Sequence, residues 1–300
     1  MGQISLGGEL LQYAITGLTV GSIYALVAIG FDIIYNVTSI INFAQGEFVM
    51  LGGLLMVFFA ATLSFPLPLA FVLTVAGVTA LGVMMERFCI FPAKNASVLT
   101  MIIITLACSI LLKGAAMYGW GKDPFVLAPF TDRGPFVVWG AAIFPQSLWV
   151  IGTMLIVVVL LTLFFRHSRF GKAMIASSDN REAAQLMGID VKTMVMVSFG
   201  LSAAIGAVAG VMITPISLME YDRGALLGLK GFGAAALGGL GHFYGAVVAG
   251  VVVGLVESFC AGLLSSGYKD AAALLILLLV LFLKPSGLFG SREVMEMKDF

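Results

Sequence analysis

The sequence predicts an all-α, polytopic integral membrane protein with about eight membrane segments, organised as a single domain over residues 1–300. Hydrophobic residues make up 60% of the chain and charged residues 11%, and the mean hydropathy is +1.08. Soluble globular domains carry about 25% charged residues, so the composition excludes that class. A helical span needs ~20 mainly apolar residues, and a series of such runs follows along the chain. No basic residue precedes Leu10, so we expect the first run to be retained as a span and not cleaved as a signal peptide.

Five apolar runs precede the longest polar interruption. They are residues 10–34, two runs within 48–85 that Pro66 and Pro68 divide, 96–118 and 147–165. A connector rich in proline and tryptophan, 119–146, joins the last two, and tryptophan is typical of the membrane interface. We therefore expect five crossings before the polar interruption.

The second half is harder to divide because it is rich in glycine. It contains a run at 194–214, a half-length helix within 231–241, a full span at about 246–264 and a final run at 271–283. Residues 220–230 are polar and predict a loop, and the sequence leaves open whether 231–245 crosses fully or re-enters. The pairs Gly17-x-x-x-Gly21, Gly206-x-x-x-Gly210 and Gly250-x-x-x-Gly254 predict close helix contacts.

The polar interruption, residues 166–193, contains a short helix signal. Asp179 is predicted to be the N-cap, and Glu182 three positions later completes a capping box. Gly188 stands where a helix-ending glycine belongs. A helix of about two turns is not stable alone in water, so we expect it to dock on a partner. At ~100° per residue, one face carries Ala183, Leu186 and Met187, and the other carries Arg181 and Gln185.

Residues 182–188, EAAQLMG, resemble the EAA-x-x-x-G loop of ABC-importer permeases, the cytoplasmic coupling helix that sits in a cleft of the ATPase subunit. Three further segments are similar in order and spacing to the LivH-type permeases of branched-chain amino-acid importers. They are GSIYALVAIG (21–30), NFAQGEFVMLGG (42–53) and KPSGLFG (284–290), and in that family the coupling match extends to REAAQLMGIDV (181–191). The resemblance thus covers nearly the whole chain. The family often has His where this chain has Gln45, so no imidazole role carries over to that position.

The resemblance implies a permease subunit of an ATP-driven importer for amino acids, branched-chain ones first, with urea or short amides as the alternative. It implies two ATP-binding cassette subunits, a second homologous permease in a heterodimer, an extracytoplasmic substrate-binding protein and a bacterial inner-membrane location. The residues it assigns to ATPase coupling are Asp179, Arg181, Glu182, Ala183, Ala184, Leu186, Met187 and Gly188.

A second polar cluster lies between the first two spans and consists of Asn42, Gln45, Gly46 and Glu47. Two interpretations stay open. The cluster can line the translocation path, because a zwitterion crossing the membrane needs polar partners. Alternatively, Glu47 stabilises the N-terminus of the second span, where the helix dipole favours a carboxylate. For Asp32 and Glu257, within apolar runs, a structural role is favoured, and the role of Lys113 stays open.

Several classes are excluded or disfavoured by what the sequence lacks. It has no Gly-x-x-x-x-Gly-Lys-[Ser/Thr] motif, so we expect no bound cofactor and ATP hydrolysis by partner subunits. Two histidines at unrelated places predict no metal site, and no nucleophile–base arrangement predicts an enzyme. A net charge of zero gives no reason to expect a nucleic-acid partner; membrane lipid is the expected surrounding. A stand-alone secondary transporter would show paired broken helices in two halves, and a passive channel or scaffold would have no use for a docking helix.

Basic residues predict the orientation in the membrane. With the coupling segment in the cytoplasm, ten basic residues are inside and five are outside. The inside set is Arg87, Lys94, Arg166, Arg169, Lys172, Arg181, Lys192, Lys284, Arg292 and Lys298, and the outside set is Lys122, Arg133, Arg223, Lys230 and Lys269. We therefore expect the N-terminus outside and the C-terminus in the cytoplasm.

Overall fold

The structure, a computed structural model, describes residues 6–94 and 96–290. Its elements are α1 (Leu6–Thr38), α2 (Gln45–Val57) with the π-helical turn η1 (Phe58–Thr62), α3 (Leu67–Met85) with η2 (Glu86–Ile90) and η3 (Phe91–Ala93), α4 (Val98–Trp120), β1 (Phe136–Val138), β2 (Ala141–Ile143), α5 (Pro145–His167), α6 (Arg169–Asp179), α7 (Arg181–Leu186), α8 (Val191–Ile213), α9 (Arg223–Gly238), α10 (Phe243–Leu263), η4 (Ser266–Tyr268) and α11 (Lys269–Leu283).

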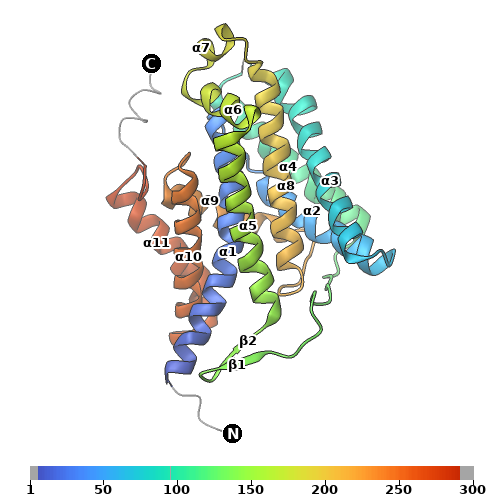
Figure 1. The fold of residues 1–300 in the computed structure, drawn as a ribbon, viewed down its shortest axis with the longest axis vertical. Coiled ribbons are helices and arrows are strands. Elements are labelled where there is room, and N and C mark those ends of the chain that lie inside the picture. The colour runs from blue at the N-terminus through green and yellow to red at the C-terminus, as the bar shows by residue number, and fades with distance from the viewer. Residues whose placement is uncertain (1–5, 95, 291–300) are drawn as a thin grey trace.

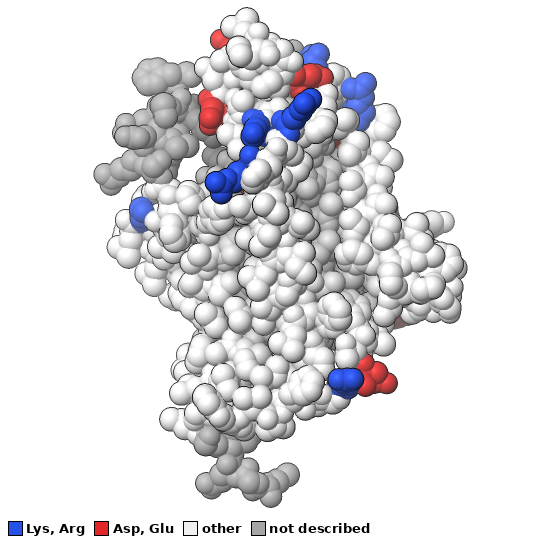
Figure 2. Space-filling model, viewed as in Figure 1, with Lys and Arg blue, Asp and Glu red and all other residues white. Residues whose placement is uncertain are grey.

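The described part of the chain contains eight helices that are long and apolar enough to cross a membrane, which confirms the predicted fold class. The helices run roughly along one axis, with α6 and α7 at one end and the hairpin β1–β2 at the other (Figure 1). We call these the α7 end and the hairpin end. On the face drawn in Figure 2, charged side chains gather toward the α7 end and at one place near the hairpin end. The broad uncharged band between them is suited to a hydrocarbon environment.

Helix α1 is the centre of the bundle and packs against α10, α8, α9 and α5. Its contact with α10 depends on glycines of both helices. A Cβ on Gly21 would lie 2.8 Å from Val251 Cα, and one on Gly250 would lie 2.5 Å from Ala25 N. The predicted glycine pairs of α1 and α10 therefore face each other, which lets the two backbones approach closely.

Helix α8 packs against α2 in the same way. A Cβ on Gly52 of α2 would lie 2.6 Å from Ala207 Cα, and one on Gly206 of α8 would lie 2.9 Å from Phe48 Cβ. By contrast, α4, α5 and α11 leave most of their surface exposed in this chain. The most deeply buried helices are thus α1, α2, α8 and α9, with α10 packed closely on α1 and the exposed apolar helices around them.

The connector 119–146 contains a hairpin that the sequence did not predict. Strands β1 and β2 pair antiparallel, with Val137 opposite Ala142. The turn residues Trp139 and Gly140 both have positive φ, 50° and 87°, which is the turn geometry that matches the twist of a two-residue hairpin. Gln12 Oε1 accepts a hydrogen bond from Ala142 N at 2.7 Å, so the hairpin is attached to α1.

Helix α9 corrects the prediction of a loop at 220–230. It begins at Arg223 and has 16 residues, about 24 Å of helix, and it is not among the eight candidate spans. Gly224 in its first turn lies against Gly46, and Gly238 at its end lies against Gly245. Gly239 and Gly241, with φ of 99° and 88°, then turn the chain into α10. Residues 231–245 therefore comprise the second half of the 16-residue helix α9, a tight turn and the start of α10.

Candidate functional site

The polar interruption 166–193 folds into two short helices at the α7 end. Ser168 caps α6, because its hydroxyl accepts from Gly171 N at 2.8 Å. Asp179 is the last residue of α6 and not the N-cap of the next helix, so that prediction is wrong. The N-cap of α7 is Asn180, whose Oδ1 accepts from Ala183 N at 2.9 Å.

The change of N-cap also removes the predicted capping box. A capping box needs the acidic residue three positions after the cap, and Glu182 is only two positions after Asn180. Glu182 still lies in the first turn of α7, where the helix dipole favours a negative charge.

The end of α7 confirms the predicted role of Gly188. Its φ is +83°, its N–H donates to Gln185 O at 2.9 Å, and Ile189 N–H donates to Ala184 O at 3.0 Å. These two bonds are the Schellman arrangement, which favours glycine at the left-handed position. The helix is thus fixed at both ends, although it has only six residues.

The two faces of α7 are used differently. Arg181 Nη2 donates to Val37 O at 2.6 Å, which attaches α7 to the end of α1, and Ala184 is buried. Leu186 and Met187 are 89% and 83% exposed. Ala183 is exposed as well, so the predicted apolar face is open at the tip of the molecule (Figure 1).

The second predicted cluster lies inside the bundle, at the start of α2. Asn42, Gln45 and Glu47 are 0%, 0% and 1% exposed. Gly46 lies between them, and a Cβ there would lie 2.8 Å from Gly228 Cα of α9. The structure therefore brings all four predicted residues together, and it places them against α8 and α9.

Gln45 belongs to a hydrogen-bond network that joins α2, α8 and α1. Its Nε2 donates to Ser202 O at 3.2 Å. The hydroxyl of Ser202 lies 2.6 Å from Gln45 Oε1 and 2.7 Å from Gly30 O, so its proton is shared between two acceptors. The sequence analysis missed Ser202, whose only signal is a hydroxyl within an otherwise apolar run.

Glu47 lies in the first turn of α2 and also faces the first turn of α9. Its Oε1 accepts from Ser109 Oγ of α4 at 2.9 Å. Its Oε2 is in close contact with the position of Gly224 and, like Asn42 Nδ2, is buried with no hydrogen-bond partner in the described part of the chain. The cluster thus combines a structural hydrogen bond with two polar atoms that remain available.

A third polar group was missed because the sequence placed Lys230 in an outside loop. Lys230 is 7% exposed, and its Nζ donates to Glu257 Oε1 at 2.8 Å and to Tyr24 Oη at 3.0 Å. It also forms an ion pair with Asp270 at 2.5 Å, and Tyr24 Oη donates to Glu257 Oε2 at 2.8 Å. This group, the Lys230 network, joins α9 to α1, α10 and α11, and it supports the structural role expected for Glu257.

Comparison with known proteins places these features in a family. Residues 13–283 match the family model described as "Branched-chain amino acid transport system / permease component". The chain is 32% identical to the high-affinity branched-chain amino acid transport system permease protein LivH of Salmonella typhimurium, over 95% of this chain and 96% of LivH. It is 34% identical to BraD of Pseudomonas aeruginosa, over 95% and 97%. A ribose import permease, RbsC of Haemophilus influenzae, is 25% identical over 87% and 81%. With eight apolar helices and a family match over nearly its whole length, the chain is a multi-pass membrane protein that belongs to the permease components of branched-chain amino acid transport systems.

Proposed function

We propose that this chain is the membrane-spanning permease subunit of an ATP-driven importer for apolar amino acids, branched-chain ones first. The single observation that carries the proposal is the open apolar tip of α7, with Leu186 and Met187 exposed on a helix that is capped at both ends. An exposed apolar face on a short, fixed helix is suited to a hydrophobic groove of another protein. The LivH and BraD similarities supply the substrate class.

The partners follow from the same arrangement. Two ATP-binding cassette subunits bind at the α7 end and hydrolyse the ATP, and this chain binds no cofactor itself. A second, homologous permease completes the pathway in a heterodimer, and an extracytoplasmic binding protein delivers the amino acid at the hairpin end. The exposed helices α4 and α11 provide apolar surface for the second permease and for lipid.

The α7 end faces the cytoplasm, which places the N-terminus outside and the C-terminus inside, in the bacterial inner membrane. The charge rule gave ten basic residues inside against five outside. Because Lys230 is buried in an ion pair, it no longer counts as a loop residue, and the outside set falls to Lys122, Arg133, Arg223 and Lys269. Of the ten inside residues, Arg292 and Lys298 lie outside the described residues, which leaves eight against four, so the two-to-one bias toward the α7 end is unchanged.

The break at the start of α2 borders the translocation path. Asn42 Nδ2 and Glu47 Oε2, both buried without a partner in the described residues, supply polar atoms for a passing ammonium and carboxylate. Gln45 does not supply such atoms, because its Nε2 and its Oε1 are both hydrogen-bonded to Ser202. The path residues proposed here are thus Asn42, Gly46 and Glu47, with Gln45 holding the break in place.

The test is the variant Leu186→Glu, assayed for recovery of the ATPase subunits with the permease and for uptake of leucine. We expect normal membrane abundance, strongly reduced ATPase recovery and uptake reduced in proportion. Val137→Glu is the matched control for ATPase recovery, because Val137 is 73% exposed at the opposite end. Unchanged ATPase recovery with Leu186→Glu would refute the assignment of α7.

A further inference from the structure

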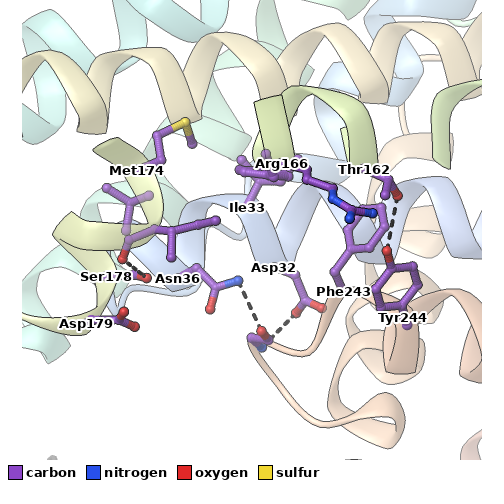
Figure 3. Close-up of a pocket in the computed structure, with 14 residues that line it drawn as sticks. Asp32, Ile33, Asn36, Thr162, Arg166, Met174, Ser178, Asp179, Phe243 and Tyr244 are labelled. Atoms are coloured by element: carbon purple, nitrogen blue, oxygen red, sulfur yellow. Dashed lines mark hydrogen bonds between the residues drawn. The ribbon is translucent and has the colours of Figure 1, made fainter. Parts of the chain in front are cut away.

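A cavity of about 480 Å³ lies at the α7 end, between α1, α5, α6 and α10 (Figure 3). Its volume is within the range of pockets that hold small molecules. Neither the tip of α7 nor the break at α2 contributes to it. The cavity is therefore a second candidate site, and its chemistry can be read from its lining.

The first feature of the cavity is the carboxyl group of Asp32, which α1 contributes. Asp32 is 1% exposed, and its Oδ1 accepts from Gly241 N at 3.1 Å. Its Oδ2 is buried with no hydrogen-bond partner among the residues that the structure describes. A buried polar atom without a partner is costly. A ligand that brings an N–H donor, above all a primary ammonium, would offset that cost.

The neighbouring donor cannot fill this role. Asn36 Nδ2 donates to Gly241 O at 3.1 Å, and Asp32 accepts from the N–H of the same residue. Figure 3 shows both side chains reaching from α1 to this one glycine. The turn between α9 and α10 is thus held by two hydrogen bonds from α1, and the second oxygen of Asp32 has no donor within the described residues.

The second feature of the cavity is a cation that α5 contributes. Arg166, in the last turn of α5, lines the cavity and is exposed. In the described part of the chain it forms no ion pair within 4 Å. Figure 3 shows its side chain extending from α5 toward Phe243, on the side of the cavity where Asp32 also lies. A guanidinium is the usual partner for a carboxylate or phosphate.

The third feature is an apolar wall, to which all four helices contribute. Ile33, Phe165, Ile175 and Phe243 line the cavity. A hydrogen-bond contact of 3.3 Å between Thr162 Oγ1 and Tyr244 Oη joins α5 to α10 beside it. The lining also contains Asp179, an exposed carboxylate at the end of α6. The buried carboxyl group of Asp32, the guanidinium and the apolar wall complement a zwitterion that carries an aliphatic group.

We propose that this cavity binds a free apolar amino acid at the α7 end, with its ammonium at Asp32, its carboxylate at Arg166 and its side chain against the apolar wall. The proposal rests on the proposed function, which makes such an amino acid the product released at this end. A phosphatidylethanolamine headgroup shares the ammonium and the anionic group. The proposed function, which delivers free amino acid to this end, favours the amino acid, and the experiment separates the two sources.

Because of where the cavity lies, a ligand bound in it would affect how the surrounding helices are arranged. It joins α6, which leads into α7, to α1, α5 and α10. A ligand that contacts all four helices favours the arrangement in which they lie together, because a ligand shifts an equilibrium toward the state that it binds better. Product at the α7 end therefore opposes further import.

The first test measures binding of radiolabelled leucine to the assembled permease–ATPase complex in nanodiscs, without the external binding protein. We expect binding to the native complex and a dissociation constant raised about tenfold or more in both Asp32→Asn and Arg166→Gln. The matched controls are Asp132→Asn and Arg133→Gln, which are exposed at neighbouring positions in the connector. No leucine binding, or binding that neither cavity variant weakens, overturns the proposal.

Lipid composition separates the two sources of the zwitterion. Discs of phosphatidylglycerol alone are compared with discs that contain phosphatidylethanolamine. Equal leucine affinity in both supports the amino acid. If phosphatidylethanolamine abolishes leucine binding, and its own retention by the complex falls in Arg166→Gln, the cavity is a lipid site and the proposal is overturned.

The second test measures the effect on transport. Vesicles are loaded with ATP, with or without leucine, and initial uptake is started by adding tracer leucine and binding protein outside. We expect internal leucine to lower uptake severalfold in the native complex and in Asp132→Asn, and to have little effect in Arg166→Gln. Uptake that internal leucine does not change overturns only this inference, whereas no uptake under any condition counts against the proposed function.

Discussion

The Lys230 network gives a prediction whose size can be worked from the structure. The variant Lys230→Met removes an ammonium that lies 2.8 Å from Glu257 Oε1, and the two side chains are 7% and 9% exposed. Removing one member of a buried ion pair costs about 3–5 kcal/mol, because the other charge stays buried. Tyr24 still donates to Glu257 Oε2 at 2.8 Å, so we expect the lower end of that range.

The assay is a double-mutant cycle on the free energy of unfolding in mixed micelles. We expect the double variant Lys230→Met/Glu257→Gln to lose less free energy of unfolding than the two single variants lose together, by about 1–3 kcal/mol. The control is Lys122→Met, at an exposed connector position, with an expected change within about 0.5 kcal/mol. If the two single losses instead add up to the loss of the double variant within about 0.5 kcal/mol, the two charges do not stabilise each other.

Three further predictions follow from single residues. Asn180→Ala should speed amide hydrogen exchange in α7, because an N-cap contributes about 1 kcal/mol, and Asp179→Ala should leave that exchange unchanged. Faster exchange in Asp179→Ala but not in Asn180→Ala would show that Asp179 is the cap. Hydrogen bonding from the Thr193 hydroxyl holds the pKa of Asp190, the N-cap of α8, below its usual 3.8. Its stabilisation is therefore present at neutral pH and lost as the pH falls through that lowered pKa, so Asp190→Ala should speed exchange at the start of α8 at pH 7 and make no difference in strong acid. Glu47→Gln should lower uptake per assembled complex; reduced protein abundance with wild-type uptake per complex would instead identify Glu47 as a helix-stabilising residue.

The membrane spans could be predicted because each depends on its own composition. An apolar run of ~20 residues has few alternatives to a transmembrane helix, and the close glycine contacts of α1 with α10 were visible as Gly-x-x-x-Gly spacings. The boundary at Asp179 was less certain for a local reason. Asp and Asn are both good N-caps, and α6 extends to Asp179, which leaves Asn180 as the cap. That choice depends on a helix that the sequence analysis had not identified.

The first half of α9 was missed because its stabilising contacts are distant in sequence. Residues 220–230 contain several charged residues and were interpreted as a loop. Lys230 is nevertheless buried, since its partners are Glu257, 27 positions away, and Tyr24, 206 positions away. These tertiary contacts stabilise the polar segment 223–230 as a helix within the bundle, and the local sequence pattern does not reveal them.

The same physics explains why the cluster at α2 was located correctly and yet interpreted only in part. Asn42, Gln45 and Glu47 are polar residues between apolar ones, which marks a place where the membrane segment is interrupted. The sequence cannot tell which of these side chains has a partner already. Gln45 does, because Ser202 lies 157 positions away and reaches both it and Gly30. Among the residues that the structure describes, Glu47 has a hydrogen-bond partner for one oxygen only, in Ser109. A residue can bind a passing substrate only through atoms that have no partner within the protein. Glu47 and Asn42 are therefore better candidates for the translocation path than Gln45.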